Sequence, residues 1–362
     1  MFRLIATLVL GLAYTSVGQA SEPIRAWQGG RTVVQTKHLI PAMKGGEGYG
    51  DKYTFNADFG ERGDMYFSLT ITNLGFGDHK MEAKGRVTLG GQTFRWKKKL
   101  DDDEWSSQSG KLNIKAGPAS LSGTPERLVF TAKSGSDSMN LVFTPIAKAW
   151  RPRNGRVLFG KERKVSDYTI FPLSKVAGQV TVGGSESEVD GTGFGTRSWS
   201  EIAVYEQARW TLEFRGISGD MTFYMRELSP TSTYERSRIA YVLFTKGDQV
   251  VFESFDYAFN PTKLFTDKQH ENGYRVPESF TITGKDAGDP SRLMRGKFEK
   301  KRLRHRSDEL KNMNSALRMV VSRFSQPVTY SYETDFLVEV KHADGVERIS
   351  GVGRYDMSHL SK

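Results

Sequence analysis

Glycines alternate at Gly191, Gly193 and Gly195, a kind of spacing that phosphate-binding loops also use. A dinucleotide-binding loop needs a further glycine at a longer interval and an amphipathic helix after it, and the sequence provides neither clearly. The stretch GRVLFGKE (155–162) resembles a nucleotide phosphate loop, but Glu162 stands where a serine or threonine would hold the metal. The alternating glycines are instead typical of a strand with glycine kinks at a barrel corner.

The remaining chemically active residue types form no motif. No two histidines have metal-ligand spacing, so a surface or loop role is expected for them. A Gly-x-Ser-x-Gly nucleophile motif is absent from the sequence, so hydrolase chemistry has no support. Catalysis by two carboxylates that are distant in sequence and brought together by the fold, as in glycosidases, is left as an open alternative. We therefore predict no metal and no cofactor; the histidines are His38, His79, His270, His305, His342 and His359.

Two basic clusters stand out in a chain whose net charge is +10. They are either solvated surface or a dock for an anionic membrane, where each basic residue contributes ~1 kcal/mol near the surface. Binding of that kind weakens steeply with salt. The candidate membrane contacts are Lys97, Lys98, Lys99, Lys300, Lys301, Arg302 and Arg304.

The N-terminus has the pattern of a secretory signal peptide, residues 1–20. A single Arg3 precedes an apolar run from Leu4 to about Ala13, and a small-residue cleavage site ends at Ala20. The run is short for a membrane span. The chain has no cysteine and so no disulfide. We expect export to a bacterial periplasm by a cleaved signal, which argues against a nucleic-acid partner despite the basic charge.

Hydrophobic alternation dominates the rest of the chain and predicts β-strands. In DMYFSLTITNL (64–74), every second residue from Met65 to Ile71 is apolar. A Gly90-Gly91 turn places Val87 opposite Phe94 in a hairpin. Many such hairpins with glycine turns predict an all-β sandwich or barrel.

One segment has helical spacing instead. Apolar residues from Leu310 to Phe324 recur at intervals of three and four, Ser307 can cap the start, and Pro327 ends the pattern. We predict an amphipathic helix over 307–324, packed on a sheet. The basic, glycine-containing stretch 149–164 lacks alternation, so we place the domain boundary there, with domains over 21–165 and 166–362.

Several segments resemble the two-domain lipocalin-like superfamily that contains the yeast survival-factor family, AttH-like proteins and carotenoid hydratases (hydroxyneurosporene synthases). In those proteins a segment like YTIFPLSKVAGQVTVGG (168–184) closes the first barrel and opens the second. One like GTGFGTRSW (191–199) lies on an early strand of the second. One like MVVSRFSQPVTYSYETDFLVEV (319–340) forms the C-terminal helix and return strand, and one like GVERISGVGRYDM (345–357) closes the barrel.

The resemblance implies two tandem lipocalin-like antiparallel β-barrels, the second with the C-terminal amphipathic helix. It also implies apolar pockets in or between the barrels. Survival-factor relatives are implied to carry sphingolipid-type lipids, and hydratase relatives to add water to isoprenoid double bonds. The hydratases and AttH-like proteins carry an Asp-His pair after a Gly-x-Gly-x motif; here Gly195-Thr196-Arg197 occupies that place. Since arginine stays charged, it cannot replace the proton donor.

These observations favour periplasmic binding or transfer of an apolar lipid, sphingolipid-like or isoprenoid-like, over catalysis. The alternative is a hydratase or cyclase acting on an isoprenoid or similar apolar substrate, for which a buried acid or tyrosine such as Asp190 or Tyr224 would be needed. A structural protein of the envelope is a third interpretation. Many apolar face residues should be ordinary core, and the candidates for contact with an apolar ligand are Phe67, Leu69, Trp96, Phe194, Arg197, Trp199, Trp210, Phe214 and Tyr224.

Overall fold

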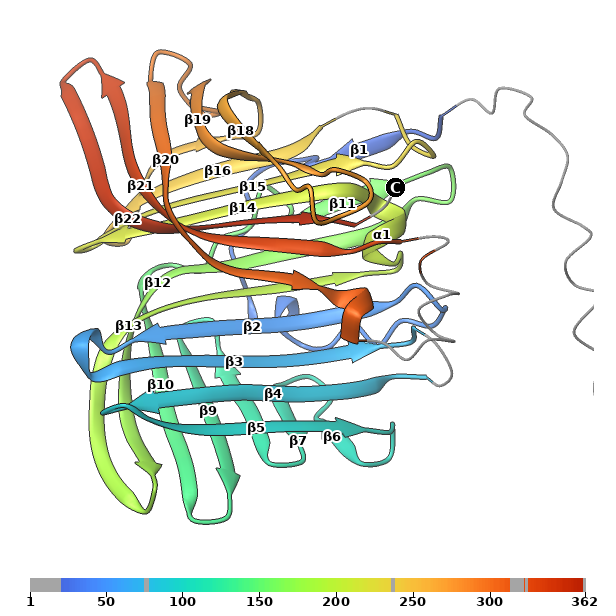
Figure 1. Cartoon of the computed structure of the whole chain (residues 1–362), viewed down its shortest axis with the longest axis vertical. Helices are drawn as coiled ribbons and strands as arrows, with labels where there is room; N and C mark the ends of the chain where they lie inside the picture. The colour runs from blue at the N-terminus through green and yellow to red at the C-terminus, as the bar shows by residue number, and fades with distance from the viewer. Residues whose placement is uncertain (1–20, 75–77, 236–237, 313–321, 323–324, 361–362) are drawn as a thin grey trace, which may run out of the picture.

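The chain folds into two curled antiparallel β-sheets, one per domain, as the computed structural model shows (Figure 1). It describes residues 21–74, 78–235, 238–312, 322 and 325–360. The first sheet has 13 strands and curls into a nearly closed barrel, and the second has 9 strands and forms a half-barrel. The predicted all-β fold with two lipocalin-like antiparallel β-barrels in tandem is confirmed, with the difference that the second barrel is only half formed.

The N-terminal sheet runs in the order β5-β4-β3-β2-β13-β12-β10-β9-β8-β7-β6, and β11 pairs with both β12 and β1. Its strands are β1 (Ile24–Ala26), β2 (Gly50–Asp58), β3 (Gly63–Thr72), β4 (Lys80–Leu89), β5 (Gln92–Leu100), β6 (Trp105–Ser107), β7 (Leu112–Ala116), β8 (Ala119–Thr124), β9 (Arg127–Ser134), β10 (Asp137–Ala147), β11 (Arg156–Phe159), β12 (Lys164–Val182) and β13 (Ser185–Ser200).

The C-terminal sheet runs in the order β17-β16-β15-β14-β22-β21-β20-β19-β18. Its strands are β14 (Ala208–Ser218), β15 (Met221–Pro230), β16 (Ile239–Lys246), β17 (Gln249–Ser254), β18 (Tyr257–Thr266), β19 (Arg275–Lys285), β20 (Leu293–Asp308), β21 (Val328–His342) and β22 (Gly345–His359). The helical elements of the described residues are short: η1 (Thr36–His38), η2 (Gly60–Arg62), α1 (Val204–Gln207) and η3 (Glu309–Asn312). No helix within these residues could cross a membrane.

Alternation translates directly into burial. On β3 the side chains of Met65, Phe67, Leu69 and Ile71 are all buried, because successive residues of a strand point to opposite faces. The Gly90-Gly91 turn joins β4 to β5 with Val87 opposite Phe94, as predicted.

Side chains fill the interior of the N-terminal barrel. The rings of Phe55, Phe130 and Phe143 lie with their centroids 4.6–5.8 Å apart. A Cβ on Gly193 would lie 2.4 Å from the Phe143 ring, and one on Gly195 would lie 2.1 Å from the Phe55 ring. The alternating glycines thus let aromatic rings pack against the backbone of β13, and they form no phosphate loop.

A separate apolar cluster joins the two domains. The indole nitrogen of Trp27 donates a hydrogen bond to the carbonyl oxygen of Ala240 at 3.1 Å, and that of Trp150 donates to the Glu253 carboxylate at 3.0 Å. Each bond connects the N-terminal part of the chain to the C-terminal domain. The joint is therefore fixed by both apolar packing and hydrogen bonds.

The change of sheet comes later than the boundary predicted at residues 165 and 166. Strands β12 and β13 pair with each other and with β10 and β2, so the chain leaves the first sheet between Ser200 and Ala208. The segment 191–199, expected in the second barrel, thus belongs to the first. Its glycines accommodate rings from the first barrel, which explains the difference.

The predicted helix over 307–324 begins differently in the structure. Ser307 and Asp308 are the last residues of strand β20, where they pair with β21, and Glu309–Asn312 form a 3-10 turn. The start of the helix at Ser307 is therefore wrong. Residues 313–321 and 323–324 lie outside the described residues, as does the predicted signal peptide, and both of these parts stay predictions.

Candidate functional site

The C-terminal half-barrel contains a cavity of about 350 Å³ at one end of its interior. Small-molecule sites usually occupy ~300–1,000 Å³, so this space suits a single compact ligand. We call it the C-terminal cavity. Its walls come from β14, β15, β18, β19 and β22 and are mostly apolar: Trp210, Leu212, Glu227, Phe259, Pro261, Leu264, Arg275, Pro277, Met357 and His359.

Glu227 of β15 is a carboxyl group on this apolar wall, and its side chain is 4% exposed. The Tyr257 hydroxyl donates a hydrogen bond to its Oε2 at 3.2 Å, and Nε of Arg238 lies 3.3 Å from its Oε1. Burial raises the pKa of Glu227, although Arg238 and Tyr257 act in the opposite direction. Because desolvation is the largest effect, the protonated acid is favoured more here than in water.

His359 of β22 lies on the same cavity. Burial lowers its pKa to about 4, so the imidazole is neutral at pH 7. Its ring stacks on Tyr274 with centroids 4.1 Å apart. Nε2 lies 3.3 Å from the carbonyl oxygen of Arg275, which can only accept, so Nε2 carries the proton. Nδ1 is then the acceptor of the ring.

Together these two groups form an acid and a base on the walls of one apolar space. A carboxyl with a raised pKa can give a proton, and a neutral imidazole can take one. The apolar lining lowers the local dielectric around Glu227 and His359, which strengthens electrostatic interactions between them and a ligand. Among the described residues, no group of three or more histidines and carboxylates is arranged to hold a metal ion.

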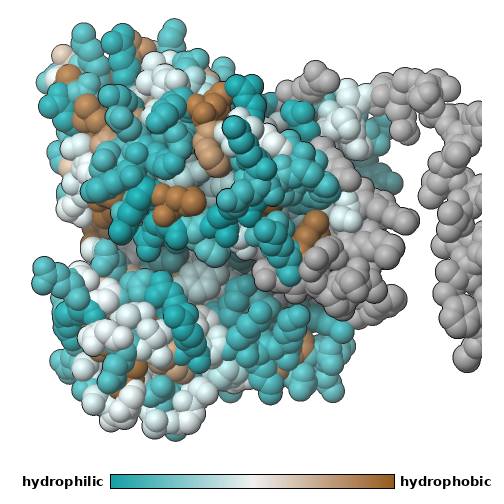
Figure 2. Space-filling view, in the orientation of Figure 1, coloured by the Kyte–Doolittle hydropathy of each residue, from teal (hydrophilic) through white to brown (hydrophobic). Residues whose placement is uncertain are grey.

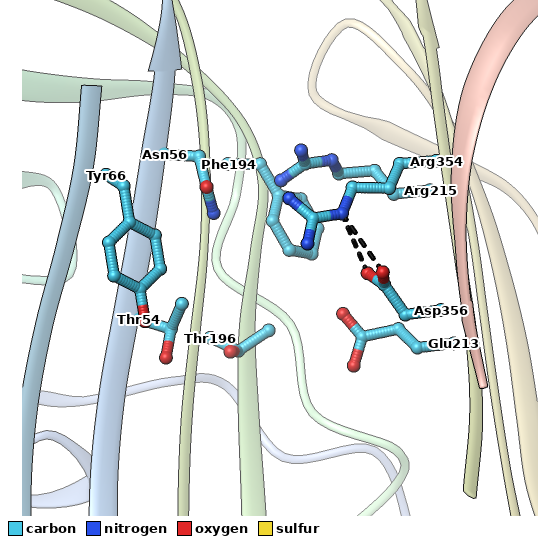
Figure 3. Close-up of a pocket in the computed structure, with 9 residues that line it drawn as sticks. All are labelled: Thr54, Asn56, Tyr66, Phe194, Thr196, Glu213, Arg215, Arg354 and Asp356. Atoms are coloured by element: carbon cyan, nitrogen blue, oxygen red, sulfur yellow. Dashed lines mark hydrogen bonds and ion pairs between the residues drawn. The ribbon is translucent and has the colours of Figure 1, made fainter. Parts of the chain in front are cut away.

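A second, smaller cleft of about 90 Å³ lies between the domains (Figure 3). We call it the inter-domain cleft. It uses the outer face of β14 and β22, whereas the C-terminal cavity uses their inner face, because neighbouring residues of a strand point to opposite sides. The N-terminal wall consists of Thr54, Asn56, Tyr66, Phe194 and Thr196, and the C-terminal wall consists of Glu213, Arg215, Arg354 and Asp356.

The residues predicted to contact an apolar ligand are distributed over the whole molecule. Trp210 lines the C-terminal cavity, and Phe194 lines the inter-domain cleft. Tyr224 lies in the joint, where its ring centroid is 5.2 Å from that of Phe194. Phe214 belongs to the core of the C-terminal domain. The other apolar candidates lie in the core of the N-terminal barrel: Phe67, Leu69, Trp96 and Trp199.

Arg197 points into the N-terminal barrel rather than toward either of these two spaces. Its Nη2 lies 2.6 Å from Oδ2 of Asp51, and the two side chains are 2% and 0% exposed. The guanidinium also donates to the carbonyl oxygens of His38 and Ile40, at 2.6 and 2.8 Å. These contacts give Arg197 a structural role in the barrel.

The two candidate proton donors named from the sequence, Asp190 and Tyr224, differ sharply in burial. Asp190 has a side chain that is 80% exposed, so it faces neither space as a buried acid. Tyr224 is fully buried, and burial raises its pKa well above the usual value. Glu227 and His359 were not among the predicted site residues. His359 was expected on the surface or in a loop, but it lies on a strand and stacks on a tyrosine ring.

The basic clusters lie on different domains. Lys97, Lys98 and Lys99 are exposed on β5, at the edge of the N-terminal sheet. The second cluster is on β20, and acidic residues of neighbouring strands balance much of its charge, through the pairs Lys300–Glu278, Lys301–Asp335, Arg302–Glu333 and Arg304–Glu333. Figure 2 shows a mostly hydrophilic face with hydrophobic residues scattered over the C-terminal domain.

The fold and the cavity define a class: a two-domain, all-β protein of lipocalin-like architecture with an apolar cavity in its second domain. No family model matches the sequence, and no curated protein matches it significantly. Solved structures do match over most of the chain, at low sequence identity. The resemblance to the AttH-like and hydratase superfamily is thereby confirmed at the level of the fold.

Structures of three proteins are informative. CghA, solved alone and with Sch210972, superposes with a TM-score of 0.62 in the unliganded form, at 10% identity over 92% of this chain and 95% of that one. An AttH protein from Nitrosomonas europaea gives 0.54 at 13% identity, over 87% and 92%. Kievitone hydratase from Nectria haematococca gives 0.51 at 12% identity, over 86% and 89%.

Proposed function

We propose that this protein is an enzyme of hydratase or cyclase type that acts on a compact apolar substrate in the C-terminal cavity. The observation that carries the proposal is the presence of Glu227 and His359 on the walls of one apolar cavity. The fold shared with kievitone hydratase, by name a hydratase, supports the same reaction class.

The chemistry follows from the two groups. The Glu227 carboxylic acid transfers its proton to one carbon of a substrate double bond, and the electron pair of the double bond forms the new C–H bond. A water molecule adds through its oxygen to the other carbon, and Nδ1 of His359 takes the proton that the water loses. Proton transfer from imidazolium to the Glu227 carboxylate restores both groups, so the net reaction is addition of one water.

Isotope incorporation tests this function. The purified protein is incubated with a panel of isoprenoid alkenes in H₂¹⁸O and, separately, in D₂O, and the products are analysed by mass spectrometry. We expect heavy oxygen and deuterium in one product. Glu227→Gln should lower turnover by about 10²–10⁴-fold, the usual contribution of a general acid. Glu299→Gln, an exposed carboxyl on β20, is the matched control.

Two results would contradict the proposal. One is the absence of label from every alkene tested. The other is a Glu227→Gln variant that turns over substrate as fast as the Glu299→Gln control. Displacement of a fluorescent apolar probe from the cavity separates lost chemistry from lost binding.

Transfer of an apolar lipid is a second candidate, favoured by the surroundings of the cavity mouth. Leu264 lines the cavity, and its neighbour Phe265 lies beneath Lys300, whose Nζ is 5.9 Å from the ring centroid. The basic residues of β20 lie next to this apolar opening, although acidic neighbours balance part of their charge, and such a surface is suited to loading from an anionic membrane, in keeping with the predicted export to the periplasm.

The carrier function has its own test. Lipids extracted from the purified protein are identified by mass spectrometry, and binding to anionic vesicles is measured at several salt concentrations. A carrier should hold a cell lipid and should leave the vesicles as salt rises. A protein without lipid, and with vesicle binding that ignores salt, would rule it out.

A further inference from the structure

Arg215 is the unusual residue of the inter-domain cleft. Its guanidinium lies over the Phe194 ring, 4.6 Å from the centroid, and so reaches across the joint to the N-terminal domain. Within the described part of the chain it forms no ion pair and no side-chain hydrogen bond. Figure 3 shows the guanidinium groups of Arg215 and Arg354 side by side on one wall of the cleft.

The other charges around the cleft are paired. Nε of Arg354 donates to the Asp356 carboxylate at 2.9 Å, and Arg226 donates to the Glu213 carboxylate at 3.1 Å. Each acid therefore has its own arginine. The charge of Arg215 is the one left over among these five groups.

The environment disfavours this unpaired charge. Burial lowers the pKa of Arg215 and the nearby charge of Arg354 lowers it further, and these two effects outweigh the opposite effect of Glu213 and Asp356. An anion placed between the two guanidinium groups would offset both effects. Arginine presents two parallel N–H donors to a carboxylate, which makes such contacts strong and directional.

The opposite wall of the cleft complements an anion as well. Thr54, Tyr66 and Thr196 present hydroxyl groups and Asn56 presents a side-chain amide, and all four can donate hydrogen bonds. No carboxylate lines the cleft from this side. An oxyanion held by Arg215 would therefore meet neutral donors on the facing domain.

We propose that the inter-domain cleft binds a small carboxylate of single negative charge, held by Arg215 and Arg354 against the hydroxyl groups of the N-terminal domain. The volume of about 90 Å³ fits a carboxylate head group, since one water occupies ~30 Å³ of liquid. One unpaired cation favours a single charge over the two of phosphate. This site is separate from the C-terminal cavity and does not depend on the function proposed for it.

The experiment titrates the purified protein with sodium acetate, and in a second arm with inorganic phosphate, at constant ionic strength. The readouts are the thermal unfolding midpoint and the NMR signals of the arginine Nε–H groups. The variants are Arg215→Gln and Arg354→Gln. Arg209→Gln, an exposed arginine on the same strand, is the matched control.

We expect acetate to raise the midpoint of the wild type and of the Arg209→Gln control, because a ligand that binds only the folded state stabilises it. Arg215→Gln should bind acetate about tenfold more weakly or worse, since it loses a charge-assisted contact. Without acetate, Arg215→Gln loses both the contact with the Phe194 ring and the repulsion from Arg354, so the effect of acetate on each variant is measured against its own midpoint without acetate.

Equal stabilisation of all variants by acetate would overturn the proposal, since it would indicate general surface binding. Tighter binding of phosphate than of acetate through Arg215 would overturn the preference for a single charge. If Arg215→Gln does not fold, Arg354→Gln carries the same test, since its side chain is 43% exposed. In that case the Arg215 Nε–H signal must also shift with acetate, and an unchanged signal refutes the site.

Discussion

Replacement of Arg197 by methionine should destabilise the N-terminal barrel strongly. The variant leaves the Asp51 carboxylate, which is 0% exposed, without its bidentate partner. Removing one member of a buried ion pair typically costs about 3–5 kcal/mol, because the remaining charge stays buried. Although burial opposes the charge of Arg197, the neighbouring Asp51 raises its pKa, so the guanidinium stays charged in the folded protein.

The loss should be large on the scale of the whole fold. Proteins are stable by about 5–15 kcal/mol, so this one change removes a substantial fraction. The slope of unfolding free energy against urea is typically about 1–3 kcal/mol per molar, so a loss of about 3–5 kcal/mol lowers the midpoint by roughly 1–5 M. Tryptophan fluorescence during urea denaturation measures this shift of the midpoint.

Two further variants sharpen the test. Asp51→Asn should cost less than Arg197→Met, because Arg197 keeps the carbonyl oxygens of His38 and Ile40 as acceptors. The double variant Asp51→Leu with Arg197→Met should recover part of the loss, since it leaves no isolated buried charge. Arg95→Met, an exposed arginine of strand β5, is the control and should change stability little.

The reasoning fails if Arg197→Met unfolds at the same urea concentration as Arg95→Met. A variant of normal stability that had lost binding of an apolar ligand would instead restore Arg197 to the ligand contacts expected from the sequence.

Two predictions concern the dependence of stability on pH, and they have opposite signs. Burial raises the pKa of Glu227 above 4.5, so wild-type stability is complete at low pH and is lost as the carboxyl ionises. Glu227→Gln should therefore be more stable than the wild type at pH 7, by about 1.4 kcal/mol for each unit by which the pKa of Glu227 is raised, and the difference should vanish below about pH 4. Urea midpoints of the two proteins are compared from pH 4 to 8, and a constant difference between them would contradict this prediction. The pKa of His359 falls from 6.5 to about 4, so the wild type should lose stability as the pH drops through that interval. His359→Phe should lack that loss, whereas the exposed His305→Gln should keep it; calorimetry across the interval decides, and identical profiles for both variants would refute the buried neutral imidazole.

The strands were predictable because their signal is local. Alternation over ten residues fixes which face of β3 is buried, and a Gly-Gly turn fixes the partner of Val87. Which strands belong to each sheet is not determined by the local sequence. Whether β13 pairs with β2 or with a later strand depends on contacts between residues more than a hundred positions apart, such as Gly195 and Phe55.

The candidate site shows the same limit more strongly. Glu227 and His359 are separated by most of the C-terminal domain, and neither belongs to a motif. Only the curvature of the sheet brings β15, β18 and β22 around one cavity. A mid-strand acid on an otherwise apolar face, as Glu227 is on the face of Phe223 and Met225, was the available signal. Arg197 illustrates the converse, because it was predicted to contact a ligand, whereas its side chain pairs with Asp51, which is far away in sequence.

The C-terminal cavity and the inter-domain cleft share their wall, since alternate residues of β14 and β22 face the two spaces. The side chains of Leu212 and Met357 line the C-terminal cavity, and those of Glu213 and Asp356 line the inter-domain cleft. Two ligands on opposite sides of one backbone are thermodynamically linked. If a ligand in the cavity changes the dissociation constant of a ligand in the cleft by some factor, the ligand in the cleft changes the dissociation constant in the cavity by the same factor. A measurement of cooperativity from either direction therefore determines it for both.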